Sequence, residues 1–325
     1  MKILGIGNAL VDILIKLDNE DLLNELNMPK GSMNLIDLQT RDEVLKKLQS
    51  EKFEMTTGGS AGNTCKALAY MNVPVGFIGK LGDNHYGQFY EKEFKQSGVE
   101  SHFIHTPNNH TGTAVTFITP DGERTFGTYL GAAVELNKNE LKKEVFSEYS
   151  YFYAEGYLVQ NHELIENAFA MAKFLGLKTA IDLASYNIVH AEREFLSSLI
   201  DKYVDIVFAN KEEAQALTGK SPEEAVKKIG EKAEISVVKS GSDGSYVAKE
   251  GEIIHVPVQT KLQPIDTTAA GDYYAAGFLY GMQNGKTMEQ CSKLGALLAG
   301  EIIRVVGTNL DETCWNNIKI RAQKI

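Results

Sequence analysis

Short runs of β-branched and aromatic residues alternate along most of the chain with longer stretches in which apolar residues recur every three to four positions. The first kind of run predicts a buried strand and the second an amphipathic helix. We expect strands at 2–7, 75–79, 151–156, 178–182, 205–209 and 235–240, and helices at 63–71, 85–98, 162–176 and 221–233. Strands that alternate with helices are typical of βαβ units, so the pattern predicts an α/β fold with a parallel sheet.

Two regions interrupt this alternation. Residues 13–40 contain short extended pieces, and residues 101–130 read as strands and turns. We interpret them as two excursions from one domain that spans residues 1–325, and we expect them to form a small β layer that acts as a lid. An edge hairpin without a moving role is the alternative.

Composition excludes several classes of protein. The chain has 325 residues, of which 43% are hydrophobic and 23% charged, as in ordinary globular proteins. Its formal net charge of −10 argues against a nucleic-acid partner, because phosphate backbones are bound by clusters of Lys and Arg. Three scattered cysteines do not make a disulfide framework, and the seven histidines show no zinc-site spacing.

The same sequence gives no sign of a membrane or of export. The first residues, MKILGIGNALVDILI, lack the apolar core and cleavage site of a signal peptide. The longest apolar run near the C-terminus is too short to span a bilayer and contains Glu301 and Arg304. We therefore expect a cytoplasmic protein without a membrane partner.

The segment PIDTTAAGDYYAAGFLYG, residues 264–281, is the most informative part of the chain. Small residues separate a strand-like end near Ile265 from the helical pattern after Asp272. Such residues at a helix N-terminus allow several backbone N–H groups to bind one anion. A carboxylate there would repel a phosphate unless it accepts a proton from an attacking hydroxyl, a combination that suits phosphoryl transfer. On these residues alone, a helix N-cap is an equally good role for Asp272.

Two segments nearer the N-terminus suggest a hydroxyl-bearing ligand. In GNALVD, the carboxylate of Asp12 can accept hydrogen bonds from two adjacent hydroxyls, as a polyol would offer. In MTTGGSAGNTCKALAYM, the pair Gly58 and Gly59 precedes a helix with Asn63 in its first turn. The alternatives are a solvated acid at a strand end and a plain turn.

Together these segments resemble the ribokinase-like, or PfkB, family of carbohydrate and nucleoside kinases. Residues 266–272 are similar to its D-T-x-[GA]-A-G-D motif, with Ala269 where many members have Gly. GNALVD resembles its G-N-x-x-x-D motif, and GGSAGN its G-G-x-x-x-N motif. The resemblance runs in family order from about residue 3 to residue 310. It implies a three-layer α/β/α fold with a mainly parallel central sheet and a small β lid, and the activity of an ATP-dependent phosphotransferase with an alcohol group as acceptor.

The resemblance also implies roles for individual residues. Asp272 would be the general base, and the anion hole for the transferred phosphoryl group would be formed by the backbone N–H groups of Ala269, Ala270, Gly271 and Asp272. The acceptor would be bound by Asn8, Asp12, Gly58, Gly59 and Asn63.

On the nucleotide side, the resemblance implies that Asn210 and Glu213 organise Mg²⁺ around the phosphates of ATP, with Glu213 acting indirectly through water. Lys239, Gly241 and Gly244 would flank the nucleotide. Arg124, in the expected lid, corresponds to an arginine that some members place near the transferring phosphoryl group, and a solvated hairpin charge is the alternative. A need for a monovalent cation such as K⁺, and the choice between monomer and homodimer, are left open.

The acceptor is less closely specified. Leu10 between Asn8 and Asp12, and the segments YAEGYLV, IDLAS and VDIVFANKEEA, are similar to the adenosine kinase branch of the family. In that branch Leu10 and Tyr157 would line a base pocket, since an aromatic face suits a planar base. We therefore expect transfer to a primary hydroxyl of adenosine, with a sugar such as ribose or fructose as the alternative.

Two competing interpretations fail, and a third is disfavoured but stays open as an alternative. Gly5-Ile6-Gly7 opens like a dinucleotide fingerprint, but Leu10 stands where the third glycine is needed. The segment GMQNGKT at 281–287 has three residues between its glycines, one fewer than a P-loop. A non-catalytic sugar- or nucleoside-binding relative of the kinases would have no use for a base at Asp272.

Overall fold

The structure is a computed structural model that describes residues 2–48, 53–121, 123–258 and 262–325. Its centre is a sheet with the strand order β14-β13-β12-β11-β10-β9-β1-β5-β6. Neighbouring strands from β6 to β12 are parallel, and β13 and β14 are added antiparallel. The strands are β1 (Ile3–Ile6), β5 (Val75–Gly82), β6 (Glu100–Thr106), β9 (Tyr151–Glu155), β10 (Lys178–Asp182), β11 (Ile206–Asn210), β12 (Ile235–Lys239), β13 (Ser245–Lys249) and β14 (Glu252–Val256).

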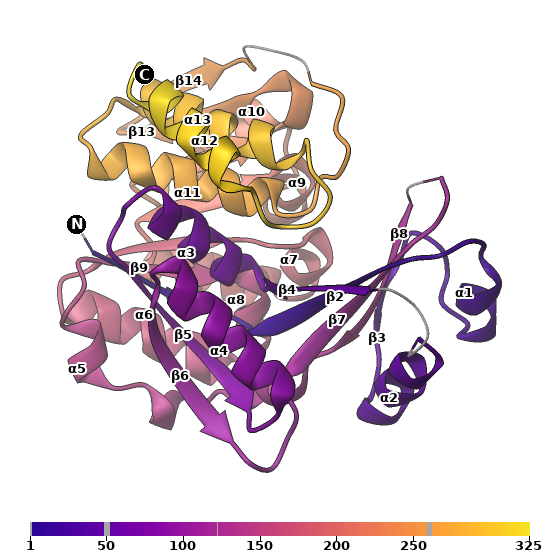
Figure 1. Ribbon diagram of the computed structural model, residues 1–325. Coiled ribbons are helices and arrows are strands. Elements are labelled where there is room, and N and C mark those ends of the chain that lie inside the picture. Colours follow the sequence, from indigo (N-terminus) through magenta and orange to yellow (C-terminus); the bar gives the residue numbers. More distant parts are fainter. Residues whose placement is uncertain (1, 49–52, 122, 259–261) are drawn as a thin grey trace.

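Helices cover both faces of this sheet and give the three layers seen in Figure 1. One face is covered by α3 (Ser60–Tyr70), α4 (His85–Ser97), α11 (Ala270–Gln283), α12 (Met288–Ile302) and α13 (Glu312–Ala322). The other is covered by α5 (Lys143–Phe146), α6 (His162–Phe174), α7 (Tyr186–Ala191), α8 (Arg193–Tyr203), α9 (Lys211–Thr218) and α10 (Pro222–Gly230). Successive strand residues enter opposite cores, as Ile3 and Leu4 do, because side chains alternate across a strand. The expected α/β/α fold is confirmed.

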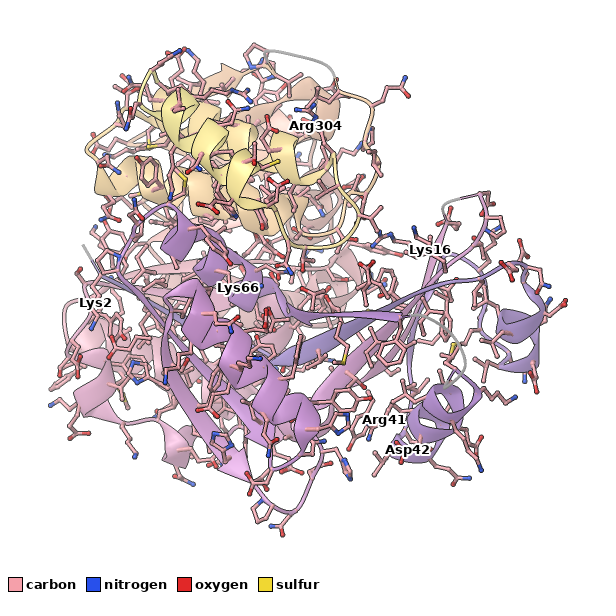
Figure 2. The ribbon with its side chains drawn as sticks, viewed as in Figure 1. Lys2, Lys16, Arg41, Asp42, Lys66 and Arg304 are labelled. Carbon is pink, nitrogen blue, oxygen red and sulfur yellow. The ribbon has the colours of Figure 1, made fainter. Side chains whose placement is uncertain are left out.

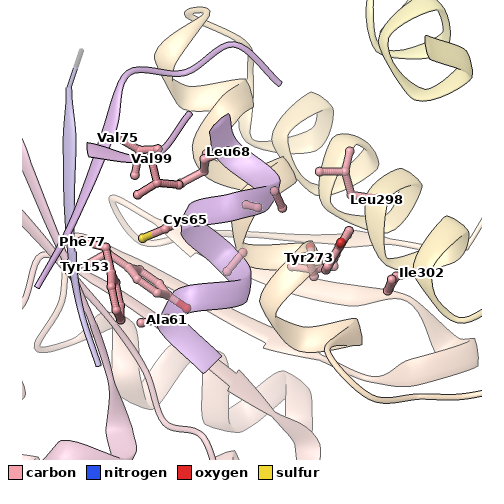
Figure 3. Packing of buried hydrophobic residues seen from close by; sticks show 14 of the residues in the cluster. Ala61, Cys65, Leu68, Val75, Phe77, Val99, Tyr153, Tyr273, Leu298 and Ile302 are labelled. Atoms are coloured by element: carbon pink, nitrogen blue, oxygen red, sulfur yellow. The ribbon is translucent and has the colours of Figure 1, made fainter. Parts of the chain in front are cut away.

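Helix α3 lies between the sheet and α11 (Figure 3). Cys65 on α3 is directed toward Phe77 and Tyr153 of the sheet, and Tyr273 of α11 lies on the other side of the helix. All four side chains are buried. This packing brings the first turn of α3 next to the first turn of α11, where the sequence motifs lie.

A second sheet, in the order β3-β8-β7-β2-β4, projects from one side of the body, with α1 (Asp21–Glu25) and α2 (Leu38–Lys47) outermost (Figure 1). Its strands are β2 (Leu10–Lys16), β3 (Met33–Leu35), β4 (Phe53–Gly58), β7 (Gly112–Ile118) and β8 (Arg124–Tyr129). Val11, Ile13 and Ile15 are buried in the apolar core of the protein, whereas Leu10 and Asp12 alternate with them and face a cleft. The small β layer that we expected is therefore present, and its movement as a lid stays a prediction.

The boundaries of this layer differ from those expected. Residues 101–106 are part of β6, the edge strand of the large sheet, where they pair in parallel with β5. Most of β6 is half-buried, so its pattern does not indicate which sheet it joins. Residues 13–40 include helix α1 and the start of α2, and the unexpected β4 completes the small sheet beside β2. Among the described residues, no helix is long and apolar enough to cross a membrane.

Candidate active site

A cleft of ≈ 1690 Å³ runs along the carboxyl ends of the parallel strands and under the small sheet. Four adjacent strands end on a polar residue that lines it: Glu155 ends β9, Asp182 ends β10, Asn210 ends β11 and Lys239 ends β12. Ligands of open α/β sheets bind at the carboxyl ends of the strands. The fold therefore gathers its polar chemistry in this cleft.

Asp272 lies in the first turn of α11, which follows Ala269 in the left-handed conformation at φ 61°. Its Oδ1 accepts a hydrogen bond of 2.7 Å from the hydroxyl of Ser60, and its Oδ2 one of 2.9 Å from Nδ2 of Asn63. Neither of these bonds caps the helix, and the residue at the N-cap position is Ala269. The carboxylate is turned toward α3 and the cleft, so the capping role is excluded.

The environment of Asp272 suits a proton acceptor. Burial raises the pKa of its carboxyl group to about 6, and the hydrogen bonds from Asn63 and Ser60 oppose this rise. The carboxylate of Asp182 raises the pKa further, whereas the ammonium of Lys239 lowers it. A carboxyl group with this pKa is ionised at neutral pH and remains basic enough to take a proton from a hydroxyl.

The N-terminus of α11 and Lys239 lie together at the end of the cleft where we expect the phosphates. The N–H groups of Gly271 and Asp272 have no acceptor among the described residues, whereas the N–H of Ala270 donates to the carbonyl of Thr267 at 3.2 Å. A Cβ added at Gly271 would lie 3.1 Å from Nζ of Lys239. A helix N-terminus and an ammonium group directed at one point fit a phosphoryl group. Of the expected N–H donors, that of Ala270 is therefore already engaged in the turn before α11.

Lys239 is held in place by Asp182, whose Oδ2 lies 2.6 Å from Nζ. Burial alone would lower the pKa of Lys239, but Asp182 and Glu213 outweigh this effect and raise it. The ammonium group therefore stays charged beside the helix N-terminus. Gly241 and Gly244 shape the following turn, and both line the cleft with φ values of 57° and 93°.

Asn210 and Glu213 cap each other at the start of α9. Oδ1 of Asn210 accepts from the N–H of Glu213 at 2.8 Å, and Oε2 of Glu213 accepts from the N–H of Asn210 at 2.7 Å. Burial raises the pKa of Glu213 to about 7, and Asp182 adds to the rise. The carboxylate of Glu213 is therefore already engaged in capping α9. A contact between Glu213 and a metal ion is more easily made through a water molecule.

The described residues include no group of three or more His, Cys, Asp and Glu side chains that could hold a metal ion. Asp182, Glu213 and Asp272 nevertheless line the same cleft. This all-oxygen donor set fits Mg²⁺, which keeps several waters and is bound mainly by substrate phosphates in kinases.

Where we expect the acceptor to bind, neighbouring atoms lie so close to Gly58 and Gly59 that neither position has room for a side chain. A Cβ at Gly58 would lie 2.4 Å from both carboxylate oxygens of Asp12, and one at Gly59 would lie 2.1 Å from the carbonyl oxygen of Asn8. Gly59 also has a φ of 89°, which side chains disfavour. The motif is therefore more than a plain turn, because it leaves room for Asn8 and Asp12.

Asn8 and Asn63 are buried, and Oδ1 of each has no hydrogen-bond partner among the described residues. Their Nδ2 groups are used, by Glu155 at 2.8 Å and by Asp272 at 2.9 Å. A buried acceptor without a partner is unfavourable by about 1–3 kcal/mol. Ligand hydroxyls would satisfy both oxygens.

Asp12 faces the same space from β2. Burial raises the pKa of its carboxyl group to about 7, while Lys66 and Arg124 lower it and Asp272 raises it. The ionised form can accept hydrogen bonds from two hydroxyls, as the sequence suggested.

Glu155, Ser60 and Asp182 were missed as individual site residues. Oε1 of Glu155 accepts from the N–H and Nδ2 of Asn8 at 2.9 and 2.8 Å, and its Oε2 accepts from the N–H of Ala61 at 2.9 Å. Glu155 thus fixes Asn8 against the start of α3. The signal that could have found Glu155 and Asp182 is an acid that ends an apolar strand.

Arg124 joins the small sheet to the phosphate end. Its guanidinium group lies 2.7 Å from Oδ2 of Asp266 and donates to Oγ1 of Thr268 at 3.2 Å. Both members of the ion pair are largely buried, with exposed side-chain fractions of 13% and 2%. Arg124 is therefore not a solvated hairpin charge.

An apolar wall adjoins the acceptor residues. Leu10 and Tyr157 line the cleft as expected, and Met33, Leu35 and Phe126 of the small sheet continue the wall. Met33 and Leu35 are 58% and 64% exposed. Large apolar side chains that remain exposed together in a cleft indicate a surface for an apolar ligand group.

The hydrogen bond between Asn63 and Asp272 gives a testable prediction. In Asn63→Ala, the pKa of Asp272 will rise because the amide no longer stabilises the ionised carboxylate. The acidic limb of kcat will therefore move to higher pH.

Asp12→Asn will instead raise the KM of the acceptor roughly 10-fold or more through lost charge-assisted hydrogen bonds. If either variant raises the KM of ATP and leaves the KM of the acceptor unchanged, the acceptor and phosphate ends of the cleft have been exchanged in our assignment.

Comparison with known proteins identifies the family of the chain. Residues 24–314 match the pfkB family of carbohydrate kinases. A solved adenosine kinase from Sinorhizobium meliloti is 34% identical, with 99% of each chain covered and a TM-score of 0.88. Adenosine kinase 2 of Arabidopsis thaliana is 26% identical over 95% of this chain and 96% of its own. A 5-dehydro-2-deoxygluconokinase of Bacillus subtilis is 28% identical over 77% and 82%. The chain belongs to the pfkB family and is an ATP-dependent kinase of the nucleoside and sugar class.

Proposed function

We propose that this kinase transfers the γ-phosphoryl group of ATP to a primary hydroxyl of adenosine. The observation that carries the proposal is the apolar wall of Leu10, Met33, Leu35 and Phe126 beside the hydroxyl-binding residues. A sugar alone would leave this wall in water, whereas a nucleoside places a planar base against it.

The polar residues suit the ribose of such a substrate. Asp12 can accept hydrogen bonds from two neighbouring hydroxyls, and the unpaired oxygens of Asn8 and Asn63 can accept others. Tyr157 lines the same cleft, and its hydroxyl donates to the carbonyl of Ala184 at 3.4 Å. We expect the ring of Tyr157 to contact the base.

The chemistry follows from the positions of Asp272 and the start of α11. The acceptor hydroxyl would donate its proton to the carboxylate of Asp272 while its oxygen bonds to the γ-phosphorus and the bond to ADP breaks. The N–H groups of Gly271 and Asp272, with the ammonium of Lys239, would stabilise charge on the transferred group. When bound, Mg²⁺ would neutralise phosphate charge, held through water by Asp182 and Glu213.

The relatives support a nucleoside without deciding it. Two of the similar proteins named above are adenosine kinases, and one phosphorylates a sugar derivative by name. The sugar kinase therefore remains the second candidate.

We expect Mg²⁺-dependent release of ADP with adenosine in a screen that also contains inosine, cytidine, ribose and fructose. Phe126→Ala should raise the KM of adenosine several-fold, because base contacts are lost, and leave the KM of ATP unchanged. Val134 lines the cleft on the segment that follows β8, and Val134→Ala tests whether that part of the wall contributes as well.

The screen separates the alternatives. Faster phosphorylation of ribose or fructose than of adenosine would make the protein a sugar kinase. No ADP release with any acceptor, from a protein that binds adenosine, would favour the non-catalytic relative.

A further inference from the structure

Lys66 on α3 is a buried cation that the proposed reaction does not yet use. The residue is only 5% exposed, and no carboxylate among the described residues lies within ion-pair distance of its ammonium group. Lys80, which is also buried, has an ion pair with Glu140 at 2.7 Å. Figure 2 shows Lys66 within the body of the protein, below the C-terminal helices. Burying an ammonium group without a paired carboxylate costs free energy, which hydrogen bonds and nearby charges must offset.

The hydrogen bonds of Lys66 reach β4, the strand that pairs with β2 beside Asp12. Its Nζ donates to Oγ1 of Thr57 at 2.7 Å and to Oδ1 of Asn309 at 2.8 Å. Nδ2 of Asn309 in turn donates to Oγ1 of Thr56 at 2.5 Å. Thr56 is the partner of Asp12 in the antiparallel pairing of β2 and β4. Lys66 therefore anchors the strand segment that lies against the acceptor carboxylate.

The same contacts lead to the phosphate end. Asn309 follows a turn in which the N–H of Gly307 donates to Oδ2 of Asp266 at 2.7 Å. The carbonyl of Thr308 accepts from the hydroxyl of Tyr273, on α11, at 2.9 Å. Asp266 begins the DTTAAGD motif and also binds Arg124. One ammonium group thus holds together β4, the 307–309 turn and, through that turn, the start of the anion hole.

Charge connects Lys66 to Asp12 as well. Burial lowers the pKa of Lys66 to about 8, while Glu93 of α4 and Asp12 of β2 raise it. In return Lys66 lowers the pKa of Asp12, together with Arg124 of β8, against burial and the carboxylate of Asp272. The positive charge of Lys66 therefore favours the ionised form of Asp12.

We propose that Lys66 is a positioning residue of the phosphoryl transfer, which fixes β4 against the 307–309 turn and favours the ionised form of Asp12 that binds hydroxyls. The inference rests on the proposed role of Asp12 in acceptor binding. It assigns a function to a side chain that does not line the cleft.

The test is the affinity of the intact protein for adenosine, measured by calorimetry as a function of pH in the absence of ATP. In the wild type, affinity should fall below about pH 7 as Asp12 is protonated, and this limb should be absent in Asp12→Asn. Lys66→Met keeps the length of the side chain but removes its charge, so the pKa of Asp12 rises. The limb should move up by about one pH unit, and affinity at pH 7 should fall roughly five-fold, because the ionised fraction of Asp12 falls from about one half to about one eleventh.

Two variants separate this role from ordinary packing. Lys80→Met removes another buried lysine and should lower stability without moving the limb. Thr57→Val keeps the ammonium group of Lys66 but removes one of its hydrogen-bond acceptors, so it should weaken binding and move the limb less than Lys66→Met does. If Lys66→Met does not fold, Lys66→Gln, which is also uncharged but can still donate, must show the same shift.

An unmoved limb in a folded Lys66 variant, or a limb that persists in Asp12→Asn, would overturn the proposal. If the screen identifies a sugar as the acceptor, the same titration is made with that sugar. A wrong acceptor is thus detected by the screen and a wrong role for Lys66 by the pH limb.

Discussion

Replacing Asp272 with asparagine will lower kcat by roughly 10² to 10⁴ and leave the melting temperature nearly unchanged. Asparagine has almost the same shape, and its amide can keep a hydrogen bond with Ser60 or Asn63. It cannot accept the proton of the attacking hydroxyl. The helix does not depend on this side chain, since the described contacts of Asp272 run to α3 and not to the N–H groups of α11.

The pH dependence of kcat supplies an independent check. Because the base acts only when ionised and the pKa of Asp272 is raised to about 6, kcat of the wild type should decline as the pH falls through this value. The residual activity of Asp272→Asn should lack that decline. Affinity for ATP should stay the same or increase, since a negative charge near the phosphates has been removed.

A matched control uses the same chemical change elsewhere. Asp311 caps α13 through the N–H of Cys314 at 2.7 Å and lies outside the cleft. Asp311→Asn should leave kcat unaltered, because asparagine is also a good N-cap. A kcat of Asp272→Asn within a few-fold of the wild type would remove Asp272 from catalysis.

The fold was predictable where each element carries its own signal. The strands that begin at Ile3, Tyr151 and Ile235 are mostly apolar and mostly buried, as both faces of a parallel sheet are covered by helices. β4 was missed because only its last three residues are buried. Which sheet β6 joins depends on contacts far away in sequence, which a local pattern does not contain.

The site was predictable where the motif and the chemistry coincide, as at Asp272. The partners of that residue were not, because Ser60 and Asn63 reach it across more than two hundred residues of chain. Asn63 was expected to bind the acceptor, yet its amide nitrogen binds Asp272 and leaves only Oδ1 for a ligand. Lys66 carried no signal at all, since one lysine in an amphipathic helix normally lies on the solvated face.

Gly58→Ala will reduce kcat/KM for the acceptor roughly 10²-fold or more, although it adds a single methyl group to a residue without polar side-chain chemistry. The added Cβ would lie 2.4 Å from both oxygens of Asp12, a distance that forces the carboxylate out of its position. The two hydrogen bonds to hydroxyls that we propose for Asp12 would then be lost, each worth about 1.5–3 kcal/mol for a charged acceptor. The KM of ATP should change little, because the phosphate end lies on α11 and β12.

Gly127→Ala is the matched control for this substitution. Gly127 is also a strand glycine of the small sheet, but its added Cβ would meet the flexible end of Met28 at 3.2 Å. Acceptor kinetics should therefore stay close to wild type in Gly127→Ala, even if stability changes slightly. The double variant Gly58→Ala/Asp12→Ala tests whether Gly58→Ala acts through Asp12. If it does, adding Gly58→Ala to Asp12→Ala should cause little further loss of acceptor kcat/KM. Additive losses in the double variant would mean that Gly58 acts on the acceptor by a route other than Asp12.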